Sequence, residues 1–170
     1  MVVCNLLRKM VLNPAIRTFV VIPLKVNDPL KGDKIWKEKH GVAIYESART
    51  RFAQLLEGMP GRKIRITLEP TGCAGVSYRL DFDDERESDV RIDFGEGIEI
   101  IVSQEPRFPS NSDPARLYSD WDFLNGIHIQ FQESLMNSKF IMDNPNAQRG
   151  CSCGVSLKPE DYGGKPIKCH

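Results

Sequence analysis

The chain has 170 residues, of which 41% are hydrophobic and 27% charged, an ordinary composition for a globular protein with its own core. Lysine and arginine together number 23, as do aspartate and glutamate, so the charge balance gives no attraction to nucleic acid or an anionic membrane. No apolar run approaches the ~20 residues of a transmembrane helix, and five unevenly spaced cysteines do not suit a disulfide-stapled secreted domain. We therefore expect an intracellular protein in a reducing compartment, with neither nucleic acid nor membrane as a partner.

The N-terminal part of the chain has an unusual charge pattern. Residues 1–27 contain four basic residues and no acidic one, which is the bias of a mitochondrial transit peptide. The same stretch has no serine, although such peptides are usually rich in serine. Two interpretations stay open: a variable extension of a bacterial cytoplasmic protein, or a targeting segment for the mitochondrial matrix. Residues 28–41 are charged and are interrupted by Pro29 and Gly32, so they predict a linker, and we assign residues 1–40 to an N-terminal extension and linker.

Residues 42–58 show helical periodicity. Five apolar residues recur at helical spacing with polar residues between them: Ile44, Ala48, Phe52, Leu55 and Leu56. Gly58 is a plausible end for the helix. The pattern predicts one main N-terminal amphipathic helix, whose apolar stripe belongs to the core.

After this helix, the hydrophobic period changes to two. Turn residues separate a series of short runs in which apolar residues alternate. These runs lie at 62–70, 77–83, 89–94, 97–103, 126–131 and 138–147. Such a series is typical of antiparallel hairpins with one exposed face. Residues 105–120 contain three prolines and predict a long loop. The fold class expected is therefore α+β, mainly β with a helix packed against the strands.

Two cysteines lie one residue apart near the end of the chain. Cys151 and Cys153 are flanked by Gly150 and Gly154, and a disulfide between them would close a strained, very small ring. Two thiolates on a glycine-flanked segment suit a soft metal ion or an iron-sulfur cluster better. Cys73 has a similar setting in a glycine-rich connection between two predicted strands. Taken alone, Cys73 would be interpreted as a small buried apolar residue.

Three segments together resemble the A-type iron-sulfur cluster carrier family, the HesB/IscA-like proteins. They are "TGCAGVSYRLDF" at residues 71–82, "FIMDNPNA" at 140–147 and "GCSCG" at 150–154. The resemblance runs from about Gly41 to Leu157 and implies a carrier domain at 41–157, followed by a C-terminal tail at 158–170. It also implies a compact HesB-like mixed β-sandwich with one main N-terminal helix.

The resemblance implies that Cys73, Cys151 and Cys153 are the cluster ligands and that the protein is not an enzyme. Its cargo would be a [2Fe-2S] or [4Fe-4S] cluster, or a mononuclear iron, passed to apo-proteins and received from scaffold proteins. A cluster normally takes four protein thiolates and one chain supplies three, so we expect a homodimer or a heterodimer with a related carrier.

Two features depart from the family pattern. Ser152 stands where the family has a glycine between the paired cysteines. The gap between Cys73 and Cys151 is longer than is usual, and the excess falls in residues 106–123. The ligands are kept, but the sequence does not assign a role to this insertion.

The cysteines also allow other interpretations. An iron donor would hold iron without sulfide, and a structural zinc site would add a histidine to the three thiolates. The candidate histidines are His40, His128 and His170, and only His170 lies beside a cysteine, Cys169, in a C-terminal segment that we predict to be an unstructured tail. A thiol enzyme with Cys73 as nucleophile would need a histidine base, and His128 is predicted to face solvent on a strand, so the sequence does not favour catalysis. Cys4 lies near the N-terminus and is predicted to be incidental.

Two further features have alternative interpretations. Tyr78 follows the turn that holds Cys73, so it could line a cluster pocket, but its place in the apolar alternation favours the core. The acidic run at residues 81–89 could recruit a basic partner, but such runs are usually solvated turns.

Overall fold

The computed structural model describes residues 21–23, 32–71, 75–133, 138–150, 157–159 and 161–163. These residues form two main sheets, one small sheet and two helices. The five-stranded sheet has the order β1 (Val21–Pro23), β11 (Ser138–Asp143), β10 (His128–Glu133), β3 (Val42–Tyr45), β2 (Ile35–Lys39). The six-stranded sheet has the order β12 (Ala147–Gly150), β13 (Leu157–Pro159), β5 (Gly75–Asp83), β4 (Lys63–Thr71), β7 (Ile98–Ser103), β6 (Asp89–Gly95).

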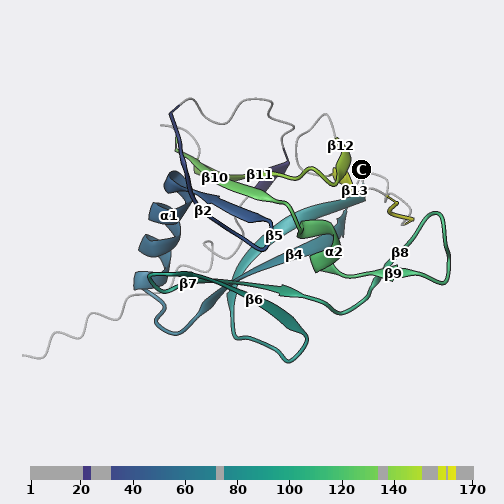
Figure 1. Cartoon of the computed structure of the whole chain (residues 1–170), viewed down its shortest axis with the longest axis horizontal. Coiled ribbons are helices and arrows are strands. Elements are labelled where there is room, and N and C mark those ends of the chain that lie inside the picture. The colour runs from purple at the N-terminus through teal and green to yellow at the C-terminus, as the bar shows by residue number, and fades with distance from the viewer. Residues whose placement is uncertain are drawn as a thin grey trace, which may run out of the picture.

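The remaining elements lie at the two sides of these sheets. Helix α1 (Glu46–Glu57) contacts β3 and β10 of one sheet and β7 of the other. It occupies one side of the molecule, and the small sheet of β8 (Phe108–Pro109) and β9 (Leu117–Tyr118) projects from the opposite side (Figure 1). The short helix α2 (Asp120–Leu124) lies between the main sheets and this projection. Neither described helix is long and apolar enough to cross a membrane.

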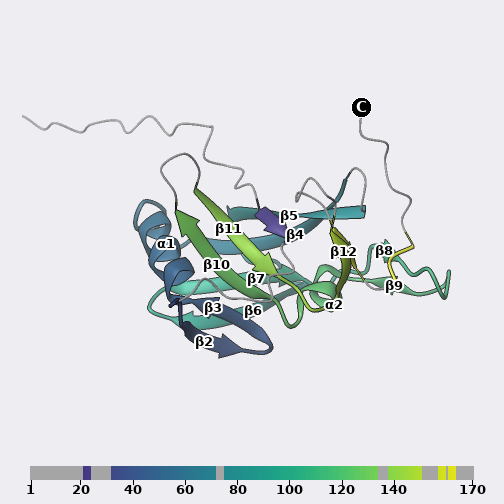
Figure 2. The same ribbon diagram turned by 90° about the horizontal axis from the view of Figure 1, so that it is seen from above.

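The core lies between the two sheets and under α1 (Figure 2). The predicted alternation is confirmed there: apolar residues at every second position of β4, β5, β6 and β7 are buried, among them Ile64, Ile66, Leu68, Leu80, Ile92, Phe94, Ile98 and Ile100. The helical stripe contributes Ala48 and Phe52, and the Phe52 ring stacks on Phe140 of β11 with 4.7 Å between ring centroids. The chain is thus mainly β with α, as the sequence predicts.

The helix prediction was wrong at its start. Val42 to Tyr45 form the fully buried strand β3, and α1 begins at Glu46. Ile44 would be buried in a strand as well as in the first turn of a helix, so its apolar character does not distinguish a strand from a helix. Ala43 and Ile44 pair with His128 and Ile129 of β10, and this distant contact makes the segment a strand.

Antiparallel hairpins, which the alternation indicates, account for only part of the two main sheets. Strands β4 and β5 form a nine-residue antiparallel hairpin, but β4 pairs with β7, β3 with β10, and β1 with β11 in parallel. Parallel pairs need long crossover connections, which a period-two pattern within each strand does not reveal.

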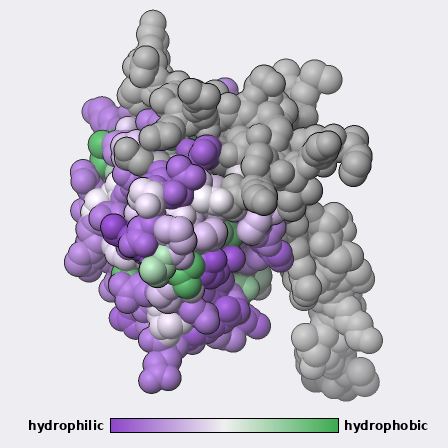
Figure 3. All heavy atoms as spheres, turned by 90° about the vertical axis from the view of Figure 1, so that its right-hand side faces the viewer, coloured by the Kyte–Doolittle hydropathy of each residue, from purple (hydrophilic) through white to green (hydrophobic). Residues whose placement is uncertain are grey.

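Two predicted irregular segments contain regular structure. Within residues 28–41, which the sequence predicts to be a linker, Ile35–Lys39 form the edge strand β2, and Lys37 donates to the Phe94 carbonyl of β6 at 2.6 Å. Within residues 105–120, predicted as a loop, β8 and β9 pair and Asp120 begins α2. The end of the molecule that carries β8 and β9 is mostly hydrophilic in its described residues (Figure 3).

Candidate functional site

The three predicted ligands, Cys73, Cys151 and Cys153, lie outside the described residues, as do Cys4, Cys169 and His170. The strands that flank the three ligands are described. Residues 72–74 connect β4 to β5, whose last pair is Thr71 with Gly75. Residues 151–156 connect β12 to β13, whose last pair is Gly150 with Leu157. The positions of the predicted ligands can therefore be considered only through these strands.

The two pairs of strands meet in one sheet. Leu157 of β13 pairs with Val76 of β5, so the order β12-β13-β5-β4 is continuous. Val76 is three residues after Cys73, and Leu157 is four residues after Cys153. The strand after Cys73 (β5) and the strand after Cys153 (β13) are therefore neighbours in one sheet, although they lie far apart in the sequence.

The strand directions limit how these connections can meet. Because β13 is antiparallel to both β5 and β12, strands β5 and β12 run in the same direction. Gly150 pairs with Leu157, and Leu157 pairs with Val76, so Gly150 lies two strand spacings, about 10 Å, from β5. It lies further still from the β4–β5 connection. The connections therefore begin at opposite sides of the Val76–Leu157 pair.

Asp120 and Arg107 complete the hydrogen bonding of β4 near its end. The parallel pairing of β4 with β7 covers only Ile64 and Arg65, so the backbone of Leu68 has no strand on that side. Its N–H instead donates to the Asp120 carboxylate at 2.6 Å, and its carbonyl accepts from Arg107 at 2.5 Å. Arg107 also donates to both Asp120 oxygens, at 2.9 and 2.7 Å. Two side chains of the insertion thus replace a neighbouring strand five residues before Cys73.

The Asn-Pro-Asn turn at residues 144–146 is attached to the other end of α2. Asn144 donates to the Phe123 carbonyl at 2.8 Å, and Asn146 donates to the Asn125 carbonyl at 2.6 Å. The backbone N–H of Asn146 donates to the Asn144 side chain at 2.9 Å, which closes the turn. Helix-end carbonyls have no partner within their helix, and here the turn that leads into β12 satisfies them.

A third attachment joins the projecting hairpin to residues 161–163. The Asp161 carboxylate accepts hydrogen bonds from the hydroxyls of Ser110, Ser112 and Tyr118, at 2.6, 2.8 and 2.9 Å, and from the Ser112 N–H at 2.8 Å. Tyr162 is buried against Phe108 and Phe123. The insertion therefore contacts β4, the Asn-Pro-Asn turn and the segment after β13.

The four hydrogen bonds to the Asp161 carboxylate predict that the stability of the protein depends on pH. The Ser110 hydroxyl and the other donors stabilise the carboxylate form and hold the pKa of Asp161 well below its usual range. A carboxyl group with a lower pKa in the folded state contributes stability that is present above its unfolded pKa, about 4, and lost as the pH falls below that value. We expect the free energy of unfolding, measured in urea between pH 6 and pH 2.5, to fall less steeply for Asp161→Asn than for the wild type.

Ser112→Ala serves as the intermediate case, because it removes one of the hydroxyl donors and keeps the titrating carboxyl group. Its slope should lie between those of the wild type and Asp161→Asn. Identical slopes for all three proteins would show that the Asp161 contacts do not stabilise the folded state.

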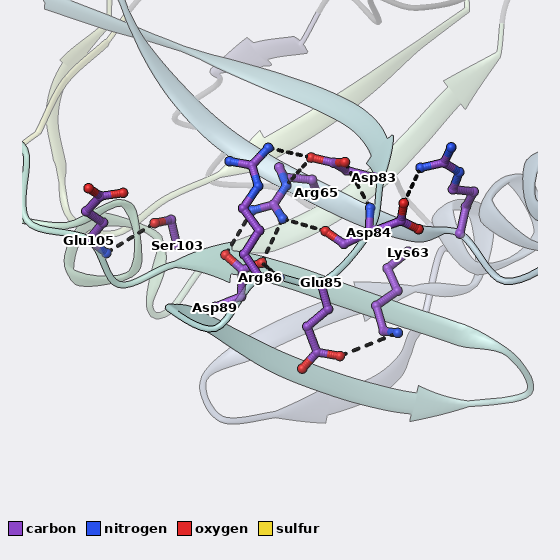
Figure 4. Close-up of polar contacts among 10 residues, drawn as sticks. Lys63, Arg65, Asp83, Asp84, Glu85, Arg86, Asp89, Ser103 and Glu105 are labelled. Atoms are coloured by element: carbon purple, nitrogen blue, oxygen red, sulfur yellow. Dashed lines mark hydrogen bonds and ion pairs between the residues drawn. The ribbon is translucent and has the colours of Figure 1, made fainter.

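The acidic run at residues 81–89 is largely neutralised from within the chain (Figure 4). Arg65 of β4 donates to Asp83 at 2.8 Å, to the Asp84 carbonyl at 2.9 Å and to both Asp89 oxygens, at 2.9 and 2.7 Å. Burial alone would raise the pKa of Asp89, but the Arg65 contacts outweigh it and the pKa is lowered. The run covers the end of β5, the turn after it and the first residue of β6, and ion pairs hold it in place, so the described contacts give no support to a basic partner there.

Tyr78 belongs to the core. The residue is 4% exposed, and among the described residues its hydroxyl makes no hydrogen bond of good geometry. Burial raises the pKa of Tyr78 well above its usual value. The described structure supports the core interpretation.

The described histidines do not form a metal site. His40 lies exposed in the turn between β2 and β3, and His128 lies half-buried on β10, where it pairs across the strands with Asp143. In the described parts of the chain, no three histidine, cysteine, aspartate or glutamate side chains gather closely enough to hold a metal ion. All five cysteines lie outside the described residues, so this finding does not bear on a zinc site built on them.

The residues that the sequence analysis missed are Arg107, Asp120, Asn146 and Asp161. One signal for α2 was present, because Ser119 and Asp122 have the spacing of a capping box, and the structure contains this box. The partners of Asp120 lie 13 and 52 residues away, and those of Asp161 lie 43 to 51 residues away, so nothing local in the sequence indicates them.

Comparison with known proteins identifies the family. No protein-family model matches the chain. Protein Rv2204c of Mycobacterium tuberculosis is 35% identical over 121 residues, which cover 69% of this chain and 90% of that protein. The iron-sulfur cluster insertion protein ErpA 1 of Methylococcus capsulatus is 30% identical over 126 residues, 73% of this chain and 86% of that protein. The chain belongs to the A-type iron-sulfur cluster carrier family.

Solved structures agree with this assignment to the A-type carriers. A crystal structure of IscA with a [2Fe-2S] cluster has a TM-score of 0.53 and 22% identity, and covers 70% of this chain and 98% of that one. Escherichia coli SufA has a TM-score of 0.51 and 25% identity, and covers 72% of this chain and 96% of that one. The fold predicted from the resemblance is thereby confirmed.

Proposed function

We propose that this A-type carrier binds an iron-sulfur cluster through Cys73, Cys151 and Cys153, shares it between two subunits and passes it to apo-proteins. The cluster is cargo and not a permanent part of the protein. The proposal rests on family membership, because named relatives are iron-sulfur cluster insertion proteins. The described observation that carries it is the pairing of Val76 with Leu157, which joins the strands next to the three cysteines.

The strand directions support a site shared between subunits. The β4–β5 connection and the β12–β13 connection start at opposite sides of the Val76–Leu157 pair. For one chain to bring all three thiolates to one cluster, residues 151–156 must fold back over a distance of more than about 10 Å. A second subunit relaxes this requirement and also supplies the fourth thiolate that a cluster normally takes. The partner subunit is a second copy of this chain or a related carrier.

Incomplete ligation suits transfer. A recipient thiolate can displace one carrier thiolate from an iron at a time, so each step forms one iron-sulfur bond and breaks another. The carrier keeps its own cysteines as free thiolates at the end, and no electrons are exchanged. The same cysteines would accept a cluster from a scaffold protein by the reverse steps.

We also propose that the carrier unit comprises residues 41–157, with an N-terminal extension before it and a tail after it. Strands β1 and β2 and residues 161–163 are attachments of these flanking segments to the unit. The choice between a bacterial cytoplasm and a mitochondrial matrix stays a prediction from residues 1–27.

Anaerobic reconstitution tests the function directly. We expect the apo-protein, incubated with iron, sulfide and a thiol reductant, to turn brown and to contain iron and acid-labile sulfide with about two subunits per cluster. Absorption spectra, metal analysis and the mass of the complex in solution would measure this. Colourless protein that retains stoichiometric zinc would contradict cluster binding and favour a structural zinc site. Iron without sulfide would favour the iron donor.

A further inference from the structure

Helix α2 is connected at both ends to strands that lead to the predicted ligands. At its N-terminal end, Asp120 holds the Leu68 N–H of β4, and at its C-terminal end the Asn125 carbonyl accepts from Asn146, which precedes β12. Helix α2 has only five residues and a capping box fixes its start. The two attachments are therefore separated by a short and rigid spacer.

The Asp120 attachment is buried and fully paired. The Asp120 side chain is 1% exposed, and its two oxygens accept one backbone and two guanidinium N–H groups. Such charge-assisted, bidentate contacts fix orientation as well as position. The same Arg107 reaches the Leu68 carbonyl, so both polar groups of that peptide position are held by the insertion.

The Asn146 attachment is similarly specific. The Asn146 side chain donates to the Asn125 carbonyl, and Asn144 donates to Phe123 on the same helix. Gly126 follows directly with φ of +93°, and a Cβ there would lie 3.0 Å from Cγ of Pro145, so the turn approaches the end of α2 closely. The chain enters β12 directly after Asn146, which is five residues before Cys151.

We propose that α2 fixes the positions of β4 and β12, the strands that precede the predicted ligands in the sequence, with Asp120 and Asn146 as positioning residues for cluster binding. This inference rests on the proposed function, and it gives a role to the insertion at residues 106–123. Neither residue touches the cluster: each acts through the strand that it holds. Groups that orient metal ligands in this way typically change metal affinity or activity by about 10- to 100-fold when they are removed.

A buried ion pair elsewhere provides a matched control. Asp89 is 0% exposed in its side chain and accepts bidentate contacts from Arg65, which also lies on β4 but at the opposite end of the β4–β5 hairpin from Cys73. Asp120→Asn and Asp89→Asn each place an amide N–H against a guanidinium donor. Both should lower stability, but only Asp120→Asn should disturb the strand that leads to Cys73.

The first experiment compares cluster release to a chelator from reconstituted wild-type protein and the two variants. We expect release to be about tenfold faster for Asp120→Asn and within about twofold of wild type for Asp89→Asn. Asn146→Ala should also release faster, and the visible circular dichroism of the cluster should change in Asp120→Asn and Asn146→Ala alone. Equal acceleration in Asp89→Asn would overturn the proposal, because general destabilisation would then explain the effect.

The second experiment uses the apo-protein and does not depend on the cluster. Amide hydrogen exchange should be faster at residues 68–71 in Asp120→Asn and at 147–150 in Asn146→Ala, with both segments unchanged in Asp89→Asn. If the wild type binds no cluster but the variants differ from it in exchange as described, the proposed function fails while the connection through α2 stands. Unchanged exchange in both segments would overturn the connection itself.

Discussion

Replacing Cys73 with serine is expected to lower cluster binding by at least about tenfold, whereas Cys169→Ser should leave it nearly unchanged. Cys73 lies between the two strands of the β4–β5 hairpin, and Val76 of that hairpin pairs with the strand after Cys153. Serine has nearly the same volume, but its hydroxyl does not ionise near neutral pH and binds iron weakly. Anaerobic reconstitution, read as absorbance per subunit and as iron and sulfide content, measures the difference.

Cys4→Ser is a second control at the other end of the chain, and it too should bind a normal amount of cluster. A loss in Cys169→Ser as large as that in Cys73→Ser would contradict the three-cysteine assignment. In that case the C-terminal Cys169 and His170 would have to be counted among the ligands.

The second large effect concerns Arg65, which is buried beneath the acidic turn. Arg65→Met should lower the free energy of unfolding by about 3–5 kcal/mol, because it leaves the buried Asp89 carboxylate without its cation. Methionine retains most of the apolar volume of the arginine stem, so the loss reflects the missing charge more than a cavity. Urea denaturation at pH 7 measures this change.

The matched control is Arg62→Met. Arg62 pairs with Asp84 at 2.9 Å, but both side chains are exposed, at 46% and 75%. Exposed pairs contribute about 0–1 kcal/mol, so this variant should differ little from wild type. Equal losses in the two variants would mean that the Arg65 pair is solvated and that its burial has no energetic consequence.

Much of the local structure could be predicted from the sequence. The alternation in β4 to β7 predicted both the strands and their buried faces, because a strand with one buried face requires apolar residues at every second position. The apolar spacing of Ala48 and Phe52 likewise predicted the buried side of α1. The cysteine pattern and its surroundings indicated the family, which the relatives confirm.

The start of α1 and the linker at residues 28–41 could not be predicted in this way. Val42 to Tyr45 suit either a helix or a buried strand, and the pairing with β10 decides between them. The strand β2 is mostly exposed and charged, and it forms because β3 offers an open edge with which it can pair. Each outcome depends on pairing with another strand, which the residues of the segment do not themselves reveal.

The sequence by itself determined the periodicity of the core, the number of thiols available and their glycine-rich surroundings. Only the tertiary structure decided that the proline-rich insertion holds β4 and the Asn-Pro-Asn turn through α2. The physical reason is that a buried backbone N–H such as that of Leu68 must find a partner, but the partner can lie anywhere in the chain. Here it is Asp120, 52 residues later, and only the tertiary fold brings these groups to 2.6 Å from each other.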